Sequence, residues 1–499
     1  MRILSKRGDL LELICVPAEL VFEIGDYLRI SQEGRTMLVQ VIDVSYPELP
    51  GTAEDLLRDM VLQEVEGRRV LDVYDTDSVS MLLKETRLVL AKIRVVVDEG
   101  RPRHNSSWIP SRYSSVFEKA TNDFLQKIVH GGCAGPFFTV GDVGSEPFSL
   151  SLRGLDGCLT IITGKKESGK SHLAKVLVES LASHGATVLV FDVNGEYLQL
   201  GKTVEGKKSH IADSIHVLEP GRNFRASLQS MGLKTFLDIL EHVYATPSTS
   251  LRELARIWKN AERRGEVSLE NLLTAVEKEN MNEAVREALL SRLQSIKSSG
   301  FFDEDHNTDI EEALSSKPNG NVAVVDLSKL LPSTRRLVVE YLLSRLSGLL
   351  GVNKLDPVFL LAEEAHLYLR ETYWEDIVTR MRHLGVFPMI VTNQPDTIPE
   401  LVYRQADNIF LFNFTNDSDL DKIAKVSKVD AETVRTLVKK MPPRYCLVIG
   451  RIVSDIPLMV RVRPSSLMTM GRTKLFFRDR ELSRRGDEKQ QPEERLQII

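Results

Sequence analysis

A short run of glycine, lysine and serine residues is the part of this sequence best suited to bind an anion. Residues 164–171 have the sequence G-K-K-E-S-G-K-S and fit the pattern G-x-x-x-x-G-K-[ST]; they follow an apolar stretch at 158–163 and precede a helix-like segment that begins at His172. In that context the glycines let successive backbone N–H groups face a phosphate, and the following helix adds the positive end of its dipole. The alternative is a chance turn, which the flanking strand and helix patterns make less favourable.

The residues of this loop have different expected roles in a nucleoside triphosphate site. Lys170 is expected to reach the β- and γ-phosphates, and the Ser171 hydroxyl is expected to ligate Mg²⁺. We therefore expect ATP and Mg²⁺ as cofactors. The residues expected to bind the nucleotide are Gly164, Lys165, Lys166, Glu167, Ser168, Gly169, Lys170, Ser171 and His172.

Two adjacent carboxylates, Glu363 and Glu364, follow a second apolar stretch at 357–362. In nucleotide hydrolases the first such acid lies near Mg²⁺, often through water, and the second activates the attacking water. The positions therefore assign Glu363 to the metal and Glu364 to catalysis. The alternative is a pair of solvated acids at a strand end, which a phosphate-binding loop earlier in the chain disfavours.

Further candidates lie around the next apolar stretch, at 387–391. Gln394 follows it, at the strand end where open α/β sheets bind ligands, and its amide is a candidate sensor of the γ-phosphate. Arg380 and Arg382 precede it, and an arginine from a neighbouring subunit would neutralise charge that develops on the γ-phosphate. The alternatives are an ordinary polar loop and ordinary surface arginines.

The elements that must position these residues fall into an N-terminal and a central region. Short β-type runs with turns between them predict a small β-barrel or sandwich over 1–97, and the next segment, 98–138, is expected to be a linker with a short helix. The runs are at 10–16, 27–30, 37–44 and 88–97.

The region 139–470 is predicted to be an α/β domain. Its apolar, β-branched runs are nearly continuous and are separated by helical patterns, which is typical of a mostly parallel sheet covered on both faces. Within it, 228–316 is predicted to be a helical insertion, and 471–499 a charged C-terminal arm. The runs are at 159–163, 187–191, 321–327, 358–362, 387–392, 408–412 and 446–450.

The bulk properties are those of a soluble globular protein of several domains, with 499 residues, 42% hydrophobic and 27% charged. A net charge of −5 means that any nucleic-acid contact must be local, with 202–208 and 252–264 as candidates. The four cysteines form no C-x-x-C pair, so neither a zinc site nor a disulfide framework is expected. Without a signal-peptide pattern or a long apolar run, we expect a cytoplasmic protein with no membrane partner.

Four blocks together resemble the HerA-type ATPases of the HerA/FtsK group of ring-shaped DNA translocases. They are S-G-K-S at 168–171, V-L-V-F-D-x-x-G-E-Y at 188–197, E-E-A-H at 363–366 and R-x-x-G-V at 382–386. Over about 1–465, the resemblance implies a barrel followed by a RecA-like ATPase domain. It also implies a homo-oligomer, a hexamer with a central channel for double-stranded DNA, with a NurA-like nuclease as partner. In such a ring Arg382 would reach into the neighbouring subunit's site.

This sequence departs from the family pattern at two places. The family has small residues and a glycine where this chain has Lys165, Lys166 and Glu167, and it has an arginine after the glutamine that corresponds to Gln394. An acid at 167 would lie close to bound phosphates unless a neighbouring lysine neutralises it.

The sequence therefore predicts an ATP-driven, ring-forming DNA translocase or helicase that acts with a nuclease in DNA-end processing. The alternative is a nucleotide-gated hexameric scaffold that organises an effector enzyme without processive translocation, which the unusual loop favours. A P-loop kinase of small molecules is a third possibility, and the paired glutamates and the large β-domain argue against it.

Overall fold

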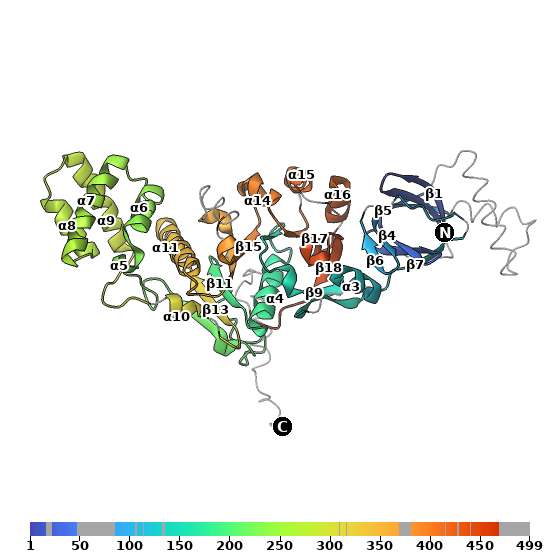
Figure 1. Ribbon diagram of the computed structural model, residues 1–499, viewed down its shortest axis with the longest axis horizontal. Helices are drawn as coiled ribbons and strands as arrows, with labels where there is room; N and C mark the ends of the chain where they lie inside the picture. Colours follow the sequence, from blue (N-terminus) through green and yellow to red (C-terminus); the bar gives the residue numbers. More distant parts are fainter. Residues whose placement is uncertain are drawn as a thin grey trace, which may run out of the picture.

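The computed structural model consists of three parts in a row: an N-terminal sheet, a central sheet with its helices, and a helical lobe (Figure 1). Part of the predicted barrel and the whole predicted arm at 471–499 lie outside the described residues. In the described part, no helix combines the length and apolarity needed to span a bilayer. The structure describes residues 1–15, 22–46, 85–104, 107–112, 114–131, 135–308, 310–315, 317–368, 380, 382–414, 416–426, 429–439 and 441–468.

The N-terminal part is an antiparallel sheet with the order β1-β2-β5-β4-β3-β7, and β6 pairs with β5. Its core is formed by alternate residues of the strands, such as Leu11 and Leu13 of β2. β7 lies in the segment expected to be a linker, yet it pairs with β3 and so completes the sheet. The strands are β1 (Arg2–Arg7), β2 (Leu10–Cys15), β3 (Tyr27–Gln32), β4 (Arg35–Ser45), β5 (Arg87–Asp98), β6 (Arg101–Arg103) and β7 (Val116–Lys119).

The central sheet has eleven strands in the order β12-β13-β11-β14-β15-β10-β16-β17-β18-β8-β9. The strands from β12 to β16 in this order are parallel, which confirms the predicted α/β class, and the remaining strands are antiparallel. The antiparallel extension makes the sheet mixed and was not predicted. The strands are β8 (Phe137–Val143), β9 (Glu146–Ser151), β10 (Thr160–Thr163), β11 (Thr187–Asp192), β12 (Ile215–Leu218), β13 (Asn321–Asp326), β14 (Val358–Glu363), β15 (Val386–Thr392), β16 (Asn408–Phe412), β17 (Tyr445–Gly450) and β18 (Leu458–Val462).

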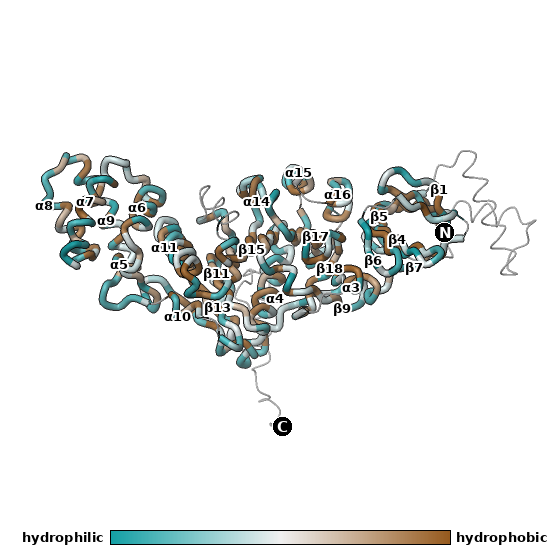
Figure 2. Tube along the Cα trace, viewed as in Figure 1, coloured by the Kyte–Doolittle hydropathy of each residue, from teal (hydrophilic) through white to brown (hydrophobic). Residues whose placement is uncertain are grey.

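Helices cover both faces of the parallel strands, so successive strand residues are buried in different clusters. Leu189 and Phe191 belong to the buried cluster that includes residues of α11 and α14 to α16, whereas Val188 and Val190 belong to the cluster that includes residues of α4. Figure 2 shows the hydrophobic residues gathered along these strands. This double burial explains why the strand sequences are apolar without alternation. The helices are α3 (Asn122–His130), α4 (Lys170–Ser183), α11 (Pro332–Gly351), α13 (Arg382–Leu384), α14 (Glu400–Arg404), α15 (Asp417–Val426) and α16 (Ala431–Lys439).

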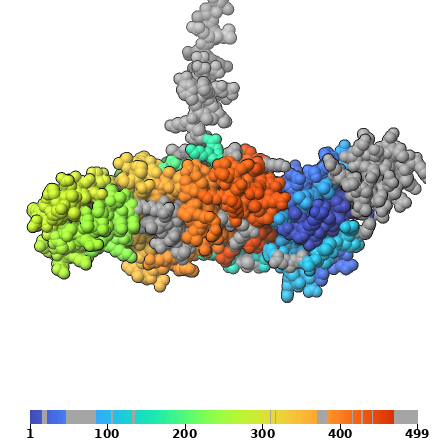
Figure 3. Space-filling model, turned by 90° about the horizontal axis from the view of Figure 1, so that it is seen from above, coloured from blue at the N-terminus to red at the C-terminus, as the bar shows by residue number. Residues whose placement is uncertain are grey.

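The helical lobe is formed by the segment predicted to be an insertion. Its helices are amphipathic; in α7, for example, Leu251, Leu254 and Trp258 are buried at helical spacing. The space-filling view shows the lobe continuous with the central part, at the opposite end from the N-terminal sheet (Figure 3). The helices are α5 (Leu228–Met231), α6 (Leu233–His242), α7 (Ser248–Arg264), α8 (Leu269–Lys278), α9 (Glu283–Ser298) and α10 (Ile310–Leu314).

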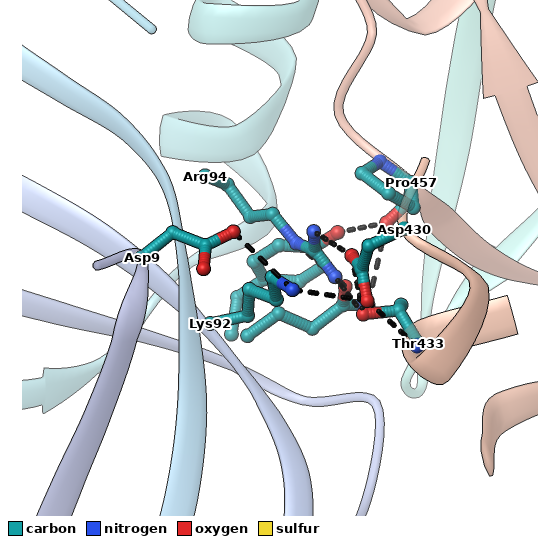
Figure 4. Close-up of polar contacts among 8 residues, drawn as sticks. Asp9, Lys92, Arg94, Asp430, Thr433 and Pro457 are labelled. Carbon is teal, nitrogen blue, oxygen red and sulfur yellow. Dashed lines mark hydrogen bonds and ion pairs between the residues drawn. The ribbon is translucent and has the colours of Figure 1, made fainter. Parts of the chain in front are cut away.

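A buried polar cluster joins the N-terminal sheet to the central part (Figure 4). Lys92 and Arg94 of β5 both pair with Asp430, at 3.0 and 3.4 Å, and the side chains of both cations are 8% exposed. Arg94 also donates to Gln40 of β4 and to Thr433 of α16, each at 2.9 Å. Burial raises the pKa of Asp430, but the Thr433 N–H and the two cations outweigh it and hold that pKa below its usual value. We call these five residues the junction cluster.

Candidate active site

The loop at 164–169 connects β10 to α4, and its conformation depends on glycine at both ends. Gly164 and Gly169 have φ values of 152° and 118°, and a Cβ on Gly164 would lie 2.4 Å from the Cβ of Phe412 in β16. Neighbouring strands support the loop: Lys165 N–H donates to Asn413 O at 3.0 Å, and Arg444 N–H donates to Ser168 O at 3.1 Å. The local motif therefore folds into a fixed turn at the start of a long helix.

Lys170 lies at the first turn of α4 and is 7% exposed. Its Nζ donates to Gly164 O at 2.9 Å and to Lys165 O at 2.7 Å. Burial lowers the pKa of Lys170, while the negative charges of Glu364, Glu363 and Glu196 oppose that shift. The ammonium group is thus held inside the loop by main-chain carbonyls, where a phosphate could replace them as its partner.

The strand register brings the predicted acids to the same edge of the sheet as the loop. Thr163 at the end of β10 pairs with Thr392 in β15, and Val391 pairs with Glu363 at the end of β14. Because these strands are parallel, their carboxyl ends meet at one edge. The loop and the residues that follow Glu363 and Thr392 therefore lie side by side.

Glu363 is 3% exposed, and its Oε1 accepts a hydrogen bond from the hydroxyl of Tyr197. Burial raises the pKa of Glu363 to about 7; the Tyr197 hydrogen bond opposes the shift, and the nearby charge of Glu196 adds to it. The Tyr368 hydroxyl donates to the main-chain oxygen of Glu363 at 2.9 Å. The positive charge of Lys175 opposes the shift in the pKa of Glu363, and a metal ion beside the carboxylate would stabilise its charged form further.

Glu364 has a φ of 46°, in the left-handed region that costs a non-glycine residue roughly 1–2 kcal/mol. Its Oε2 lies 3.5 Å from Nδ1 of His366, which is itself 3.3 Å from Oγ1 of Thr392. Burial lowers the pKa of His366, so the ring is neutral near pH 7. The strained backbone thus turns Glu364 away from the strand direction and beside a neutral imidazole.

The polar groups at this edge fit a phosphate and a divalent cation. Within the described ranges, Ser168 Oγ and Asn393 Oδ1 are buried and have no hydrogen-bond partner in the protein. Buried polar groups are normally paired, so unpaired ones at a glycine-rich loop indicate a ligand or ordered water. Lys170 and the loop N–H groups would hold phosphate oxygens, and Ser171 and Glu363 would hold Mg²⁺.

The other predicted residues are placed as follows. Lys165, Lys166 and Glu167 are exposed, and Glu167 has a φ of 61°, the conformation that a glycine adopts without strain. His172 is half-buried, and its Nδ1 has no partner among the described residues. Gln394 is exposed at the same edge, and its N–H donates to Thr392 Oγ1 at 3.0 Å.

Arg382 lies at the opposite edge of the sheet, before β15 begins. Its guanidinium donates to Gly157 O at 2.8 Å and pairs with Asp407 at 2.9 Å, both near the amino ends of β10 and β16. Arg382 is therefore remote from the phosphate-binding loop of its own chain. Arg380 is exposed.

Three residues near the site were not assigned a role from the sequence: Tyr197, Lys175 and Arg444. The first two lie in or beside recognisable blocks, but an apolar or helical pattern gives no sign of where a hydroxyl or ammonium group points. Arg444 is exposed beside the loop and has a φ of 69°. It is 276 positions from Ser168, and no local pattern links the two.

Residues 162–346 match the family model described as the central domain of the helicase HerA. Among curated proteins, the chain is similar to the DNA double-strand break repair helicase HerA of Sulfolobus acidocaldarius, with 23% identity over 324 residues, 59% of this chain and 62% of that protein. It thus aligns with less than two thirds of that relative's length. A probable helicase of Methanocaldococcus jannaschii is 21% identical over 479 residues, 88% of this chain and 86% of that protein.

Solved structures with a similar fold include the conjugative coupling protein TrwB. Its complex with sulphate has a TM-score of 0.52 and 14% identity, over 70% of this chain and 94% of that one. A complex of TrwB with ADP and Mg²⁺ has a TM-score of 0.51 over the same shares. At this identity the likeness shows the fold alone. The family match and the curated relatives, not this likeness, confirm the resemblance found in the sequence: residues 162–346 match a HerA helicase central domain, and the chain is a distant relative of the HerA helicases.

Proposed function

We propose that the chain hydrolyses ATP and that, assembled as a hexameric ring, it uses the energy to move double-stranded DNA. The observation that carries the ATPase assignment is the convergence at one sheet edge of the loop, Lys170, Glu363 and the strained Glu364. The ring, the DNA and a NurA-like nuclease partner in DNA-end processing are what the resemblance to the HerA/FtsK group implies; the relatives are DNA double-strand break repair helicases by name, which supports the DNA and its repair.

The chemistry follows from the positions of the side chains. Lys170 exchanges its two main-chain carbonyls for phosphate oxygens, while Ser171 and Glu363 hold the cation. Mg²⁺ held there would supply positive charge to the phosphates. Glu364 accepts a proton from the attacking water as the water oxygen bonds to the γ-phosphorus and the bond to the bridging oxygen breaks, which releases ADP. Gln394, exposed at the same edge, contacts the γ-phosphate.

Arg382 is proposed to act on the neighbouring subunit's nucleotide. Its place at the opposite edge of the sheet from its own loop supports this role, and ring assembly would exchange Asp407 for a phosphate. Lys170→Ala and Arg382→Ala should each be nearly inactive. When the two variants are mixed under subunit exchange, some interfaces hold an intact loop and an intact arginine, so part of the ATPase activity should return. Mixed rings, identified by mass spectrometry, without activity would contradict the trans role.

A nucleotide-gated scaffold is the second candidate, because Glu167 places a strained acid beside the phosphates. Steady-state ATPase activity with and without double-stranded DNA, and with and without a candidate nuclease, separates the two. A motor requires stimulation by DNA; hydrolysis that only the nuclease changes favours the scaffold. Glu364→Gln is the control: it keeps the side-chain shape and removes the base, so ATP binding should persist while turnover falls by roughly 10² or more. Wild-type turnover in this variant would remove Glu364 from the mechanism.

A further inference from the structure

A buried network of polar side chains lies directly behind the proposed metal-binding acid. It runs from Glu363 through Tyr197 to Lys175 and Glu196, and it connects β14, the segment after β11, and α4. Only Glu363 has a part in the proposed chemistry. Tyr197, Lys175 and Glu196 have no part in it, yet the fully buried hydroxyl of Tyr197 points at a carboxylate and not at a main-chain carbonyl.

The backbone that carries Tyr197 is fixed by Asp192 at the end of β11. The two carboxylate oxygens of Asp192 accept the N–H groups of Glu196 at 3.0 Å and Tyr197 at 2.8 Å. Tyr197 is 0% exposed, and its hydroxyl donates to Glu363 Oε1. The hydroxyl is thus placed by a short, rigid turn and not by a flexible loop.

Lys175 fixes the ring of the same tyrosine. Its Nζ lies 5.1 Å from the centre of the Tyr197 ring and pairs with Glu196 Oε2 at 3.0 Å, and its side chain is 2% exposed. A cation over an aromatic face attracts the ring, more strongly where both are removed from water. Lys175 follows Ser171 by four residues in α4, so both side chains are on the same face of the helix. The proposed metal-binding hydroxyl and the anchor of Tyr197 therefore belong to one rigid element.

We propose that Tyr197 is the positioning residue for Glu363: it holds one carboxylate oxygen so that the other is presented to a divalent cation shared with Ser171. The inference rests on the proposed nucleotide site and deepens it. Ligand carboxylates in metal sites are commonly oriented by such hydrogen bonds, and loss of the orienting group costs 10- to 100-fold in metal affinity or activity. A tyrosine that only filled the core would affect stability and leave the effect of the cation on nucleotide binding unchanged.

The test compares binding of a non-hydrolysable ATP analogue by calorimetry, in the full-length chain, with Mg²⁺ and with EDTA. The ratio of the two affinities measures how much the cation contributes. In Tyr197→Phe the ring and its contact with Lys175 remain, so affinity in EDTA should stay within about twofold of wild type while the ratio falls about tenfold. Half-maximal ATPase activity should then need about tenfold more Mg²⁺, and saturating Mg²⁺ should restore most of the turnover.

Tyr27→Phe is the matched control. Tyr27 is 4% exposed, and its hydroxyl donates to Pro457 O next to the junction cluster, so the variant also loses a buried hydroxyl hydrogen bond. Its ratio of affinities should equal that of wild type. The ratio should also fall in Glu363→Gln. The double variant Tyr197→Phe/Glu363→Gln should have the same ratio as Glu363→Gln alone, because the hydroxyl acts through that carboxylate.

Three results would overturn the inference. An unchanged ratio in Tyr197→Phe, whether the two affinities are kept or fall equally in Mg²⁺ and in EDTA, would make the tyrosine a structural residue. Additive losses in the double variant would show that it does not act through Glu363. If circular dichroism shows that Tyr197→Phe does not fold, Lys175→Met is the second variant. It removes the cation that holds the Tyr197 ring and should lower the ratio about threefold. An unchanged ratio in Lys175→Met would also refute the positioning role of Tyr197. A wild-type chain that binds no nucleotide would refute the proposed function itself, whereas a normal wild type with a normal Tyr197→Phe refutes this inference alone.

Discussion

The junction cluster and the phosphate-binding edge are both buried and polar, but they differ in how fully their groups are paired. At the junction, Lys92 contacts both Asp9 and Asp430, and Arg94 is shared among Gln40, Asp430 and Thr433 (Figure 4). At the phosphate-binding edge, Ser168 and Asn393 retain buried oxygens without partners in the described part of the chain. The difference shows which cluster is complete within the protein and which requires a ligand.

The same contrast appears in the charges. Asp430 lies between two cations, and its pKa is lowered; Glu363 is buried beside Glu196, and its pKa is raised to about 7. The two clusters are connected, because Asp430 caps α16 by accepting the Thr433 N–H at 2.9 Å, and the loop after α16 leads to Arg444, whose N–H donates to Ser168 O.

The largest effect on stability is expected at the junction. Asp430→Ala leaves Lys92 and Arg94 buried with fewer partners and removes a helix cap, and the loss of one member of a buried ion pair costs roughly 3–5 kcal/mol. Because Asp430 is itself 27% exposed, we expect about 3 kcal/mol in the free energy of unfolding of the N-terminal sheet, measured by urea denaturation.

Asp421→Ala is the matched control in the neighbouring helix. Asp421 pairs with Arg435 of α16 at 2.6 Å, and both side chains are about half exposed, at 44% and 45%. Exposed pairs contribute at most about 1 kcal/mol. Equal losses in the two variants would show that the junction is no more than a surface contact.

At the phosphate-binding edge, removal of the charge of Glu363 should stabilise the fold at neutral pH, whereas removal of the charge of Asp430 destabilises it. The raised pKa of Glu363 means that the fold favours its protonated form. The contribution of the protonated Glu363 side chain to the free energy of unfolding is fully present below about pH 4.5. It is lost as the pH rises to about 7, where the buried carboxylate is charged. The free energy of unfolding of Glu363→Gln minus that of wild type should therefore rise by roughly 2 kcal/mol between pH 5 and 8.

Thermal and urea unfolding in EDTA, without nucleotide, measure this difference. The comparison of variant and wild type at each pH removes the contributions of the other titrating groups. A difference that stays constant with pH would mean that Glu363 is already paired in the protein, and the contrast with the junction would then disappear.

Much of the fold could be predicted because the signals are local. The strand β14 coincides with the apolar stretch before Glu363, and the helical segment in 228–316 was visible from its charged, strand-free pattern. The predicted run at 446–450 forms β17, but its antiparallel pairing and the extension by β18, β8 and β9 were not predicted. The order of these strands depends on which edges meet in space, and β8 and β18 are more than 300 residues apart along the chain.

The candidate site divides in the same way. The loop, Glu363 and Glu364 are contiguous motifs, and the parallel register brings them together as expected. Tyr197 contacts Glu363 across 166 positions, and Arg382 pairs with Asp407 at the far edge of the sheet, so neither contact had a local signature. The backbone strain at Glu167 and Glu364 is also a property of the folded loop, to which the sequence gives no direct access.

The smallest expected effect concerns Glu167, where the structure combines strain and charge. Glu167 is exposed, with a φ of 61°. Glu167→Gly should relieve roughly 1 kcal/mol of left-handed strain and remove a negative charge beside the phosphates. We expect the ATP analogue to bind several-fold more tightly by calorimetry, with little change in the free energy of unfolding, because glycine also gains entropy in the unfolded chain.

Two further variants separate the causes. Glu99→Gly relieves the same kind of strain, at a φ of 49° in the turn after β5, and should leave nucleotide binding unchanged. Glu167→Gln removes the charge and keeps the strain, so the fraction of the gain that it reproduces is the electrostatic part. If Glu167→Gly binds ATP no more tightly than wild type, Lys165 or Lys166 already neutralises the acid. The charges of the loop would then be paired within the protein, as they are at the junction cluster. The unpaired polar groups of the site would be limited to those that face the phosphates.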